Sequence, residues 1–244
     1  MIGAFNAPAA ETDAPYPSNP NIHAMKLSRR RVKRHETSAV RTRILDIATR
    51  LFADRGFLGV SLREIMSAAD ANVASAHYYF GSKDSLYEAC VLRYFTTVDA
   101  ARRERLDAAL KQPEAHRDAQ LLSILVAYTE PHYELLSHPE GADYVRMIAR
   151  FLAEPPDAVK RMLVGHFGPT RMTYLAALKA LFPGADDATL WRAFSFFVDM
   201  MLSAPFDVGY ESFVSRAPSD DRATELTRLV TRFGMGGFLA TFGE

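Results

Sequence analysis

The sequence has 244 residues, 48% of them apolar, which suits one large domain or two small ones with a sizeable core. Its 29 Lys and Arg balance 29 Asp and Glu, and a formal net charge of zero argues by itself against a nucleic-acid-binding protein. Cys90 is the only cysteine, which excludes a disulfide within the chain, and no apolar run approaches the ~20 residues that span a membrane, so we expect a cytoplasmic protein.

The first 36 residues are predicted to form a disordered, proline-rich and basic arm. Residues 1–24 lack the basic start and apolar core of a signal peptide. Residues 26–36, KLSRRRVKRHE, are either a solvated tail or an arm that follows phosphates or enters the minor groove. From Lys26 to Arg55, ten Lys and Arg stand against three Asp and Glu. A basic lobe on a net acidic remainder indicates a DNA-binding part with a separate function behind it.

The first ordered element is a predicted helix from about Ser38 to Asp54, ended by Gly56. Apolar residues at helical spacing form its buried stripe: Val40, Ile44, Ile47, Ala48 and Leu51. Three more are expected to pack it against the next helices: Phe52, Phe57 and Leu58. Thr42 and Arg43 lie off the stripe near the helix start, where they either contact phosphate or are ordinary surface residues.

A second helix begins with the S-x-x-E pattern of Ser61 and Glu64, a capping box that satisfies backbone N–H groups at a helix start. Asp70-Ala71-Asn72 interrupts it with residues that tolerate a turn. Asn72 can then cap a third short helix, Val73–Tyr79, which Gly81 closes. Two helices joined by a tight turn predict a helix-turn-helix motif.

In that motif, the N-terminal residues of the second helix meet base edges in the major groove. Hydrogen-bonding side chains and small residues on and around this helix are the candidate DNA contacts, together with Thr42 and Arg43: Ser61, Arg63, Asn72, Ala74, Ser75, His77, Tyr78, Tyr79 and Lys83. Ala74 would let the backbone approach DNA or pack on the first helix, and Lys83 suits a phosphate. Phe80 is expected in the core. Tyr78 is favoured for DNA contact, and His77 either reads a base or supports the interface.

The chain resembles the TetR family of transcriptional regulators. The resemblance rests on residues matching in order and spacing: Thr42-Arg43-Ile44-Leu45, Ala48, Leu51-Phe52, Gly56-Phe57, Ser61-Leu62-Arg63-Glu64-Ile65, Tyr78-Tyr79-Phe80-Gly81-Ser82-Lys83 and Leu86. Two positions depart from the family pattern. Asp70-Ala71 stands where the family usually has Gly-Val, at some cost in strain, and Tyr79 stands where it often has His.

The remainder of the chain is predicted to be helical throughout, so the fold class is all-α, with a helix-turn-helix domain of three helices followed by a larger helical domain. A long helix from Lys83 to Leu110 leads into segments with helical patterns and no alternating strand pattern: 118–137, 142–153, 157–166, 169–181, 187–203 and 222–242, with a break at Gly168-Pro169 and an exposed loop at 205–219. We divide the chain into an arm (1–36), a DNA-binding domain (37–97) and an effector-binding and dimerisation domain (98–244).

The last two helices carry apolar residues on more than one face, which predicts burial on both sides. One side can face the core and the other a partner subunit; the residues are Trp191, Phe194, Phe196, Phe197, Met200 and Met201, then Leu226, Leu229, Val230, Phe233 and Phe238. The family resemblance implies a four-helix dimer interface, and two-fold symmetry suits reading of a palindromic operator. Gly234, Gly236 and Gly237 are interpreted as close helix–helix packing.

No catalytic or metal-binding constellation is present in the sequence of the second domain, and no cofactor is expected. Dispersed aromatic and methionine residues are either ordinary core or the lining of an adaptable effector pocket: Tyr128, Met147, Phe151, Met162, Phe167, Tyr174, Trp191 and Phe194. This region also resembles family members that respond to fatty acids or their CoA esters. Four basic residues could meet a carboxylate or phosphate: Arg146, Arg150, His166 and Arg171.

These observations predict a homodimeric, sequence-specific DNA-binding regulator, with no enzymatic activity and no membrane association, located in the cytoplasm at the nucleoid. We expect a repressor that a small hydrophobic effector releases from double-stranded DNA. Two alternatives stay open. One is a small-molecule enzyme or lipid-binding protein with a vestigial DNA-binding lobe, and the other is a regulator controlled by a protein partner through residues 205–219.

Overall fold

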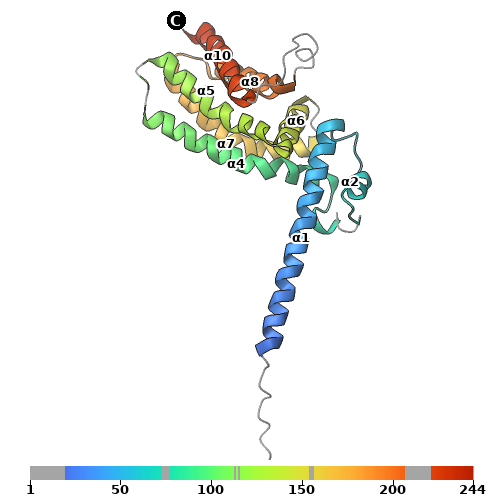
Figure 1. Ribbon diagram of the computed structural model, residues 1–244. Coiled ribbons are helices and arrows are strands. Elements are labelled where there is room, and N and C mark those ends of the chain that lie inside the picture. Colours follow the sequence, from blue (N-terminus) through green and yellow to red (C-terminus); the bar gives the residue numbers. More distant parts are fainter. Residues whose placement is uncertain are drawn as a thin grey trace, which may run out of the picture. The chain divides into compact units, whose positions relative to one another are not determined.

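The computed structural model describes the backbone of residues 20–72, 77–112, 114, 116–153, 157–206 and 221–243, and the side chains of these residues except 20–37, 152–153 and 157–164. The chain divides into two compact units, Met1–Val40 and Arg41–Glu244. We refer to residues 41–97 as the N-terminal lobe and to residues 98–243 as the helical body. The described residues contain helices and no strand, so the predicted all-α class is confirmed (Figure 1).

The described residues of the N-terminal lobe include the last part of α1 (Pro20–Arg55), α2 (Leu62–Ala68), a helical segment at residues 77–79 and the beginning of α4 (Lys83–Lys111). Buried apolar residues of α1, α2 and α4 meet in one core: Ile44, Ala48 and Phe52 of α1, Ile65 and Met66 of α2, and Leu86, Cys90 and Val91 of α4. Phe80 is also buried, as predicted, whereas Leu58 is 85% exposed, so its predicted core role is wrong.

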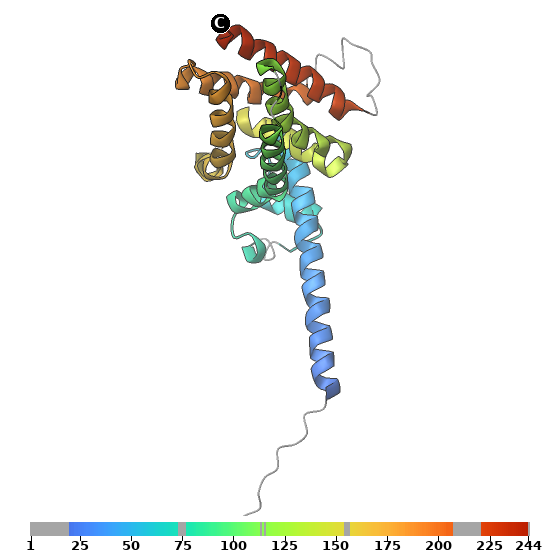
Figure 2. The ribbon, with the colours of Figure 1, turned by 90° about the vertical axis from the view of Figure 1, so that its left-hand side faces the viewer.

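The described part of the helical body consists of the rest of α4 and five further α-helices. These are α5 (Arg117–Tyr133), α6 (Pro139–Ala153), α7 (Asp157–Leu181), α8 (Asp187–Ser203) and α10 (Arg222–Phe242), with short 3₁₀ helices at Glu134–Ser137 and Ala204–Phe206. Helix α5 packs against α4 on one side and against α10 on the other (Figure 1), and Figure 2 shows the same helices from the side. The largest fully buried side chains of this core include Tyr133, Tyr174, Phe194 and Phe238.

Helix α4 belongs to both parts and is continuous from Lys83 to Lys111. Its buried residues recur at helical intervals along the whole helix: Leu86, Tyr87, Cys90, Val91, Phe95, Val98, Asp99, Arg102 and Leu106. Ser82 caps its start, since the Ser82 side chain accepts from the backbone N–H of Ser85 at 3.1 Å. The helix therefore contributes buried side chains to both parts.

Two predicted helix boundaries are wrong. Helix α1 begins at Pro20 and not near Ser38, so the basic segment 26–36 lies within a helix. Proline suits the first helical position, and the Arg, Lys and Glu that follow are good helix formers. Helix α7 continues through Pro169, where a break was predicted. A proline removes one backbone hydrogen bond and can kink a helix without ending it. Residues 1–19, and most of the predicted loop at 205–219, lie outside the described residues.

Candidate nucleic-acid interface and effector site

The entry to α2 is fixed by the predicted capping box. The side chain of Ser61 accepts from the backbone N–H of Glu64 at 3.2 Å, and the N–H of Ser61 donates to the Glu64 carboxylate at 2.7 Å. Arg55, at the end of α1, donates to the same carboxylate at 3.1 Å. These hydrogen bonds from Ser61 and Arg55 lower the pKa of Glu64 to about 2. The Ser61 hydroxyl is therefore engaged in the cap, and Arg63 beside it is exposed.

The turn after α2 places Asp70 in the left-handed region, with φ of 46°. The N–H of Ala71 donates to the Met66 carbonyl at 3.0 Å, and that of Asp70 donates to the Ser67 carbonyl at 3.2 Å, which together form a Schellman motif. The strained turn expected at Asp70 is thus confirmed. Arg43, a candidate phosphate contact, reaches the turn instead and donates to the Asp70 carbonyl at 3.3 Å.

The end of the candidate reading helix presents one side chain to solvent. Residues 77–79 are helical, Tyr78 is 80% exposed, and its ring lies 5.0 Å from that of Tyr79 in an edge contact. His77 Nδ1 lies 2.9 Å from the Gly81 carbonyl oxygen, so Nδ1 is the donor and Nε2 remains for another partner. The candidates Ala74 and Ser75 lie outside the described residues.

Lys83 stands at the start of α4, where the helix dipole favours an anion. Its ammonium lies 4.2 Å from the centre of the Phe57 ring, and partial burial lowers the pKa of Lys83. The Phe57 ring in turn packs at 5.3 Å from that of Tyr87. These contacts hold the ammonium in place at the helix start.

Two other candidates, Thr42 and Asn72, are exposed. Thr42 lines an open groove of about 480 Å³ between α1, α4 and α7. His166 of α7 faces Glu88 of α4 at 3.5 Å in this groove, so the imidazole that we considered for an effector anion already has an acidic neighbour.

The effector-pocket candidates fall into separate groups. Tyr128, Tyr174 and Phe194 form a buried aromatic cluster, with ring centres 4.9 Å apart for the two tyrosines and 5.0 Å apart for Tyr128 and Phe194. Met147 and Phe151 are buried on α6. The Phe167 ring packs against the Phe95 ring, with ring centres 4.4 Å apart. Trp191 lies at the surface and is 44% exposed. The side chain of Met162 lies outside the described residues.

Of the arginines considered for an anion, only Arg171 lies beside a ring of the aromatic cluster. Arg146 pairs with Asp143 at 2.6 Å and with Asp54 of α1 at 3.0 Å. Arg150 is exposed, and the guanidinium of Arg171 lies over the Trp191 ring at 4.4 Å. Arg171 alone approaches the cluster, since its guanidinium lies 5.6 Å from the centre of the Phe194 ring, and its side chain is half-buried.

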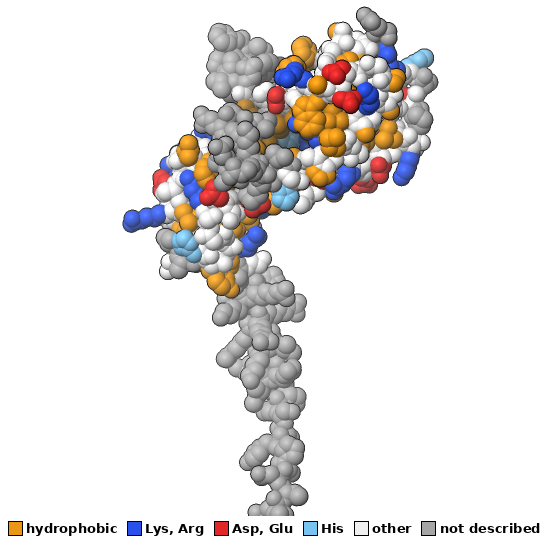
Figure 3. Space-filling model, turned by 180° about the vertical axis from the view of Figure 1, so that it is seen from behind, with side chains coloured by type: hydrophobic (Ala, Val, Ile, Leu, Met, Phe, Trp, Pro, Cys, Tyr) orange, Lys and Arg blue, Asp and Glu red, His pale blue; other side chains and the backbone are white. Residues whose placement is uncertain are grey.

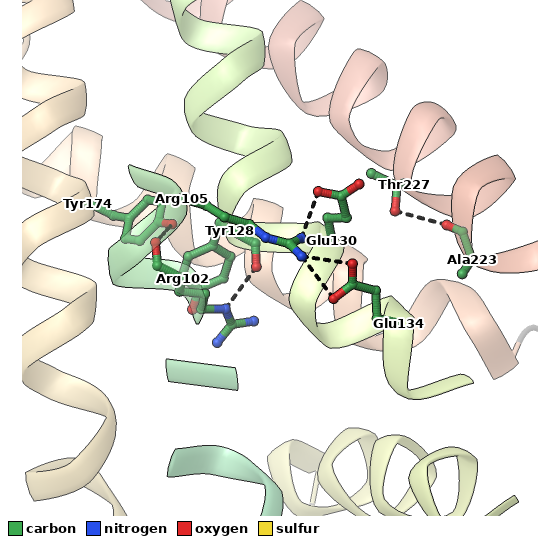
Figure 4. A network of polar contacts seen from close by, with 8 residues as sticks. All are labelled: Arg102, Arg105, Tyr128, Glu130, Glu134, Tyr174, Ala223 and Thr227. Atoms are coloured by element: carbon green, nitrogen blue, oxygen red, sulfur yellow. Dashed lines mark hydrogen bonds and ion pairs between the residues drawn. The ribbon is translucent and has the colours of Figure 1, made fainter. Parts of the chain in front are cut away.

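Arg102 was missed by the sequence reasoning, because it stands in the charged run Arg102–Arg105 that reads as surface. It is only 6% exposed, and its guanidinium carbon lies 3.8 Å from the centre of the Tyr128 ring. The hydroxyl of Tyr174 donates to the Arg102 carbonyl oxygen at 2.8 Å (Figure 4). A usable signal was present, since Arg102 continues the apolar stripe of α4, four residues after Val98 and four before Leu106.

Several large apolar side chains of the helical body reach the surface. The exposed ones on α7, α8 and α10 are Met172, Trp191, Phe196, Leu229 and Phe233, and Figure 3 shows apolar side chains gathered on one face of the body. On α8, Phe194, Phe197 and Met201 are buried, so this helix has one buried and one exposed apolar face. Of the three glycines predicted at close packing, Gly234 meets the Phe197 ring, while a Cβ at Gly236 or Gly237 would meet nothing within 4 Å. The packing prediction is wrong for these two within one protomer.

Within the part of the chain that the structure describes, no group of three or more His, Cys, Asp or Glu could hold a metal ion. The same described part contains no helix with the length and apolar character needed to cross a bilayer.

Family models match both parts of the chain. One described as bacterial regulatory proteins, tetR family, matches residues 44–90, and one described as tetracyclin repressor-like, C-terminal domain, matches residues 126–237. The chain is 31% identical over 149 residues to the HTH-type transcriptional regulator BetI of Rhizobium meliloti, which covers 61% of this chain and 68% of that one. It is 32% identical over 110 residues to the HTH-type transcriptional repressor NicS of Pseudomonas putida, covering 45% of this chain and 48% of NicS.

Solved structures share the fold. The crystal structure of PfmR, a TetR-family transcriptional regulator from Thermus thermophilus, aligns with a TM-score of 0.54 at 18% identity. The alignment covers 80% of this chain and 97% of that one, so the helical architecture is common to both proteins.

Proposed function

Because this chain belongs to the TetR family of DNA-binding transcriptional regulators, we propose that it is a homodimeric repressor that a small hydrophobic effector releases from a palindromic operator. The observation that carries the DNA-binding site is Tyr78, a large side chain 80% exposed at the end of the candidate reading helix. His77 precedes it in the chain and has Nε2 available for a partner, and Lys83 follows at the start of α4. We assign direct reading to this helix and backbone contacts to Thr42, Lys83 and the helix start at residue 83.

We propose that residues 37–97 bind DNA and that residues 98–244 bind the effector and form the dimer. Helix α6 joins the two parts, since Arg146 pairs with Asp54 of α1 at 3.0 Å and the Phe151 ring lies 6.1 Å from that of Tyr87. An effector that favours one position of α4 and α6 would change the spacing of the two reading helices in the dimer. A tenfold loss of operator affinity requires only about 1.4 kcal/mol of differential binding.

Replacing Tyr78 by Phe should weaken operator binding about 3- to 10-fold and leave the dimer intact. The change removes one hydroxyl, and a hydrogen bond contributes about 0.5–1.5 kcal/mol. Fluorescence anisotropy with DNA flanking the chain's own gene, at several salt concentrations, measures the loss. Tyr94→Phe removes a hydroxyl outside the candidate interface and serves as the matched control. Equal affinity of Tyr78→Phe and the unchanged protein would remove Tyr78 from the contacts.

Replacing Phe233 by Glu should raise the dissociation constant of the dimer at least tenfold. Phe233 is 76% exposed in one protomer, and a charge there would be buried against the partner's apolar side chains. Light scattering after size exclusion gives the mass at each concentration. Leu110→Glu is the control, since Leu110 is also exposed but lies at the end of α4. A Phe233→Glu variant that stays dimeric would place the interface elsewhere.

Two other functions make different predictions for the same titration. A lipid-binding protein or enzyme with a vestigial DNA-binding lobe would bind DNA without sequence selectivity. A regulator controlled by a protein partner would bind its operator selectively but would not respond to small hydrophobic ligands. Selective binding that weakens with salt, together with release by a ligand, supports the proposed repressor.

A further inference from the structure

Helix α4 carries three arginines within four residues, and two of them have carboxylate partners. Arg103 pairs with Asp99 at 2.6 Å. Arg105 pairs with Glu130 at 2.6 Å and with Glu134 at 2.7 Å. For Arg102, no carboxylate among the described side chains lies within 4.0 Å. Figure 4 shows Arg105 directed toward its two glutamates and Arg102 directed away from them.

The present partners of the Arg102 guanidinium are all neutral. Its Nε donates to the Tyr128 carbonyl oxygen at 2.8 Å, and its plane lies against the Tyr128 ring. Its Nη2 faces the sulfur of Met201 at 3.9 Å, which is a weak acceptor. A cation that is 94% removed from solvent is costly when no opposite charge compensates it. An anion at this position would supply the missing charge.

His132 of α5 adds an unsatisfied polar atom in the same region. Its side chain is 3% exposed, and Nε2 has no hydrogen-bond partner among the described residues. Burial and the neighbouring charge of Arg102 lower the pKa of His132 to about 3, so the imidazole is neutral at pH 7. A neutral imidazole protonated at Nε2 can donate one hydrogen bond to an anion.

We propose that Arg102 binds the carboxylate of the effector, and that this effector is a monocarboxylic acid with an apolar body. The proposal rests on the proposed function, in which the helical body binds a hydrophobic effector. One guanidinium without a counter-charge suits one negative charge, and His132 provides a second hydrogen bond. The aromatic cluster of Tyr128, Tyr174 and Phe194 provides the apolar surroundings.

The carboxylate would replace the weak contact between Arg102 and Met201. Methionine has three flexible torsions and adapts to a new neighbour at low cost. A thioester of the same acid lacks the negative charge at this atom, so the free acid should bind more tightly than its CoA ester. Arg102 belongs to the continuous helix that begins at Lys83, so a new contact here acts directly on the N-terminal lobe.

Calorimetric titration at pH 7.5 compares octanoate with 1-octanol, and 4-phenylbutyrate with 4-phenylbutanol, on the full chain. We expect at least one acid to bind at least tenfold more tightly than its alcohol. Arg102→Met should lose this tenfold preference, and Arg102→Lys should retain part of it because the charge is kept. Arg105→Met is the matched control, since it removes an arginine three residues away that already has partners, and it should bind as the unchanged protein does.

The proposal is overturned if neither acid binds more tightly than its alcohol, a comparison that needs no variant. It is also overturned if folded Arg102→Met binds the acid as the unchanged protein does, or if octanoyl-CoA binds more tightly than octanoate. Operator affinity without ligand is measured separately by anisotropy. Loss of the acid preference with intact operator binding removes this inference alone, whereas acid binding without operator binding removes the proposed function alone.

Discussion

Replacing Gly234 by Val should destabilise the protein by about 3 kcal/mol and lower Tm by about 6–12 °C. Gly234 lies on α10 where it passes α8, and a Cβ there would come within 2.8 Å of Cε2 of Phe197 and closer still to Cδ2. Phe197 is 3% exposed, and its ring lies 6.2 Å from that of Phe194 and 6.5 Å from that of Phe238. The ring cannot turn away without displacing these neighbours. Chemical denaturation at one fixed protein concentration measures the loss.

Replacing each of two glycines by alanine should change the stability of the protein in opposite directions. Gly165→Ala in α7 meets nothing within 4 Å, so the higher helix propensity of alanine should stabilise the protein by up to about 1 kcal/mol. Gly234→Ala has the same gain in propensity but must also displace Phe197, so it should be net destabilising. If both variants are equally stable, then α8 and α10 are not packed as closely as the structure shows.

Lowering the pH from 7 to 5 should remove about 2 kcal/mol of stability through His132 alone. Burial, helped by the charge of Arg102, lowers the pKa of His132 to about 3, against 6.5 for an ordinary histidine. The unfolded chain therefore takes up a proton below about pH 6.5 while the folded chain does not, until about pH 3. The stability present at pH 7 is lost progressively across this window. Urea denaturation at pH 7.5, 6 and 5 measures the free energy of unfolding as a function of pH.

His132→Gln should flatten this profile, because glutamine takes up no proton in either state. His116→Gln is the matched control, since it replaces an exposed histidine just before the start of α5. His132→Leu offers a second variant, in which the unsatisfied polar atom is also removed. Parallel profiles for the protein and both His132 variants would show that this imidazole is not buried as the structure places it.

The helix-turn-helix could be predicted closely because its signals are local. Ser61 and Glu64 indicate the start of α2, Asp70 indicates the turn, and Ser82 indicates the start of α4. Each of these signals depends only on residues within one or two helical turns along the chain. Most of the candidate DNA contacts lie in the same short stretch. The position of the Arg43 guanidinium on the turn carbonyl was not predictable, because it depends on how α1 packs beside α2.

The candidate effector site could be predicted only in outline, because it depends on packing between distant segments. Aromatic residues of the body were identifiable, but only three-dimensional packing separates the buried Tyr128, Tyr174 and Phe194 from the exposed Trp191. Arg102 was hidden by its charged neighbours, since a buried cation runs against the usual preference of arginine for the surface. The continuation of α7 through Pro169 shows in the same way that packing can override a local breaking signal.

The single cysteine of the sequence has an unreactive thiol, and this makes the protein suitable for spectroscopic labelling at an introduced cysteine. Cys90 is buried, its Sγ donates to the Leu45 carbonyl oxygen, and burial raises the pKa of the thiol to about 12. It therefore stays protonated and unreactive near neutral pH. A cysteine introduced at Leu58, which is 85% exposed, would be the one site that reacts with a spin label. A symmetric dimer would then carry two identical probes, and a single pulsed-resonance distance would report how far apart its two N-terminal lobes stand with and without octanoate.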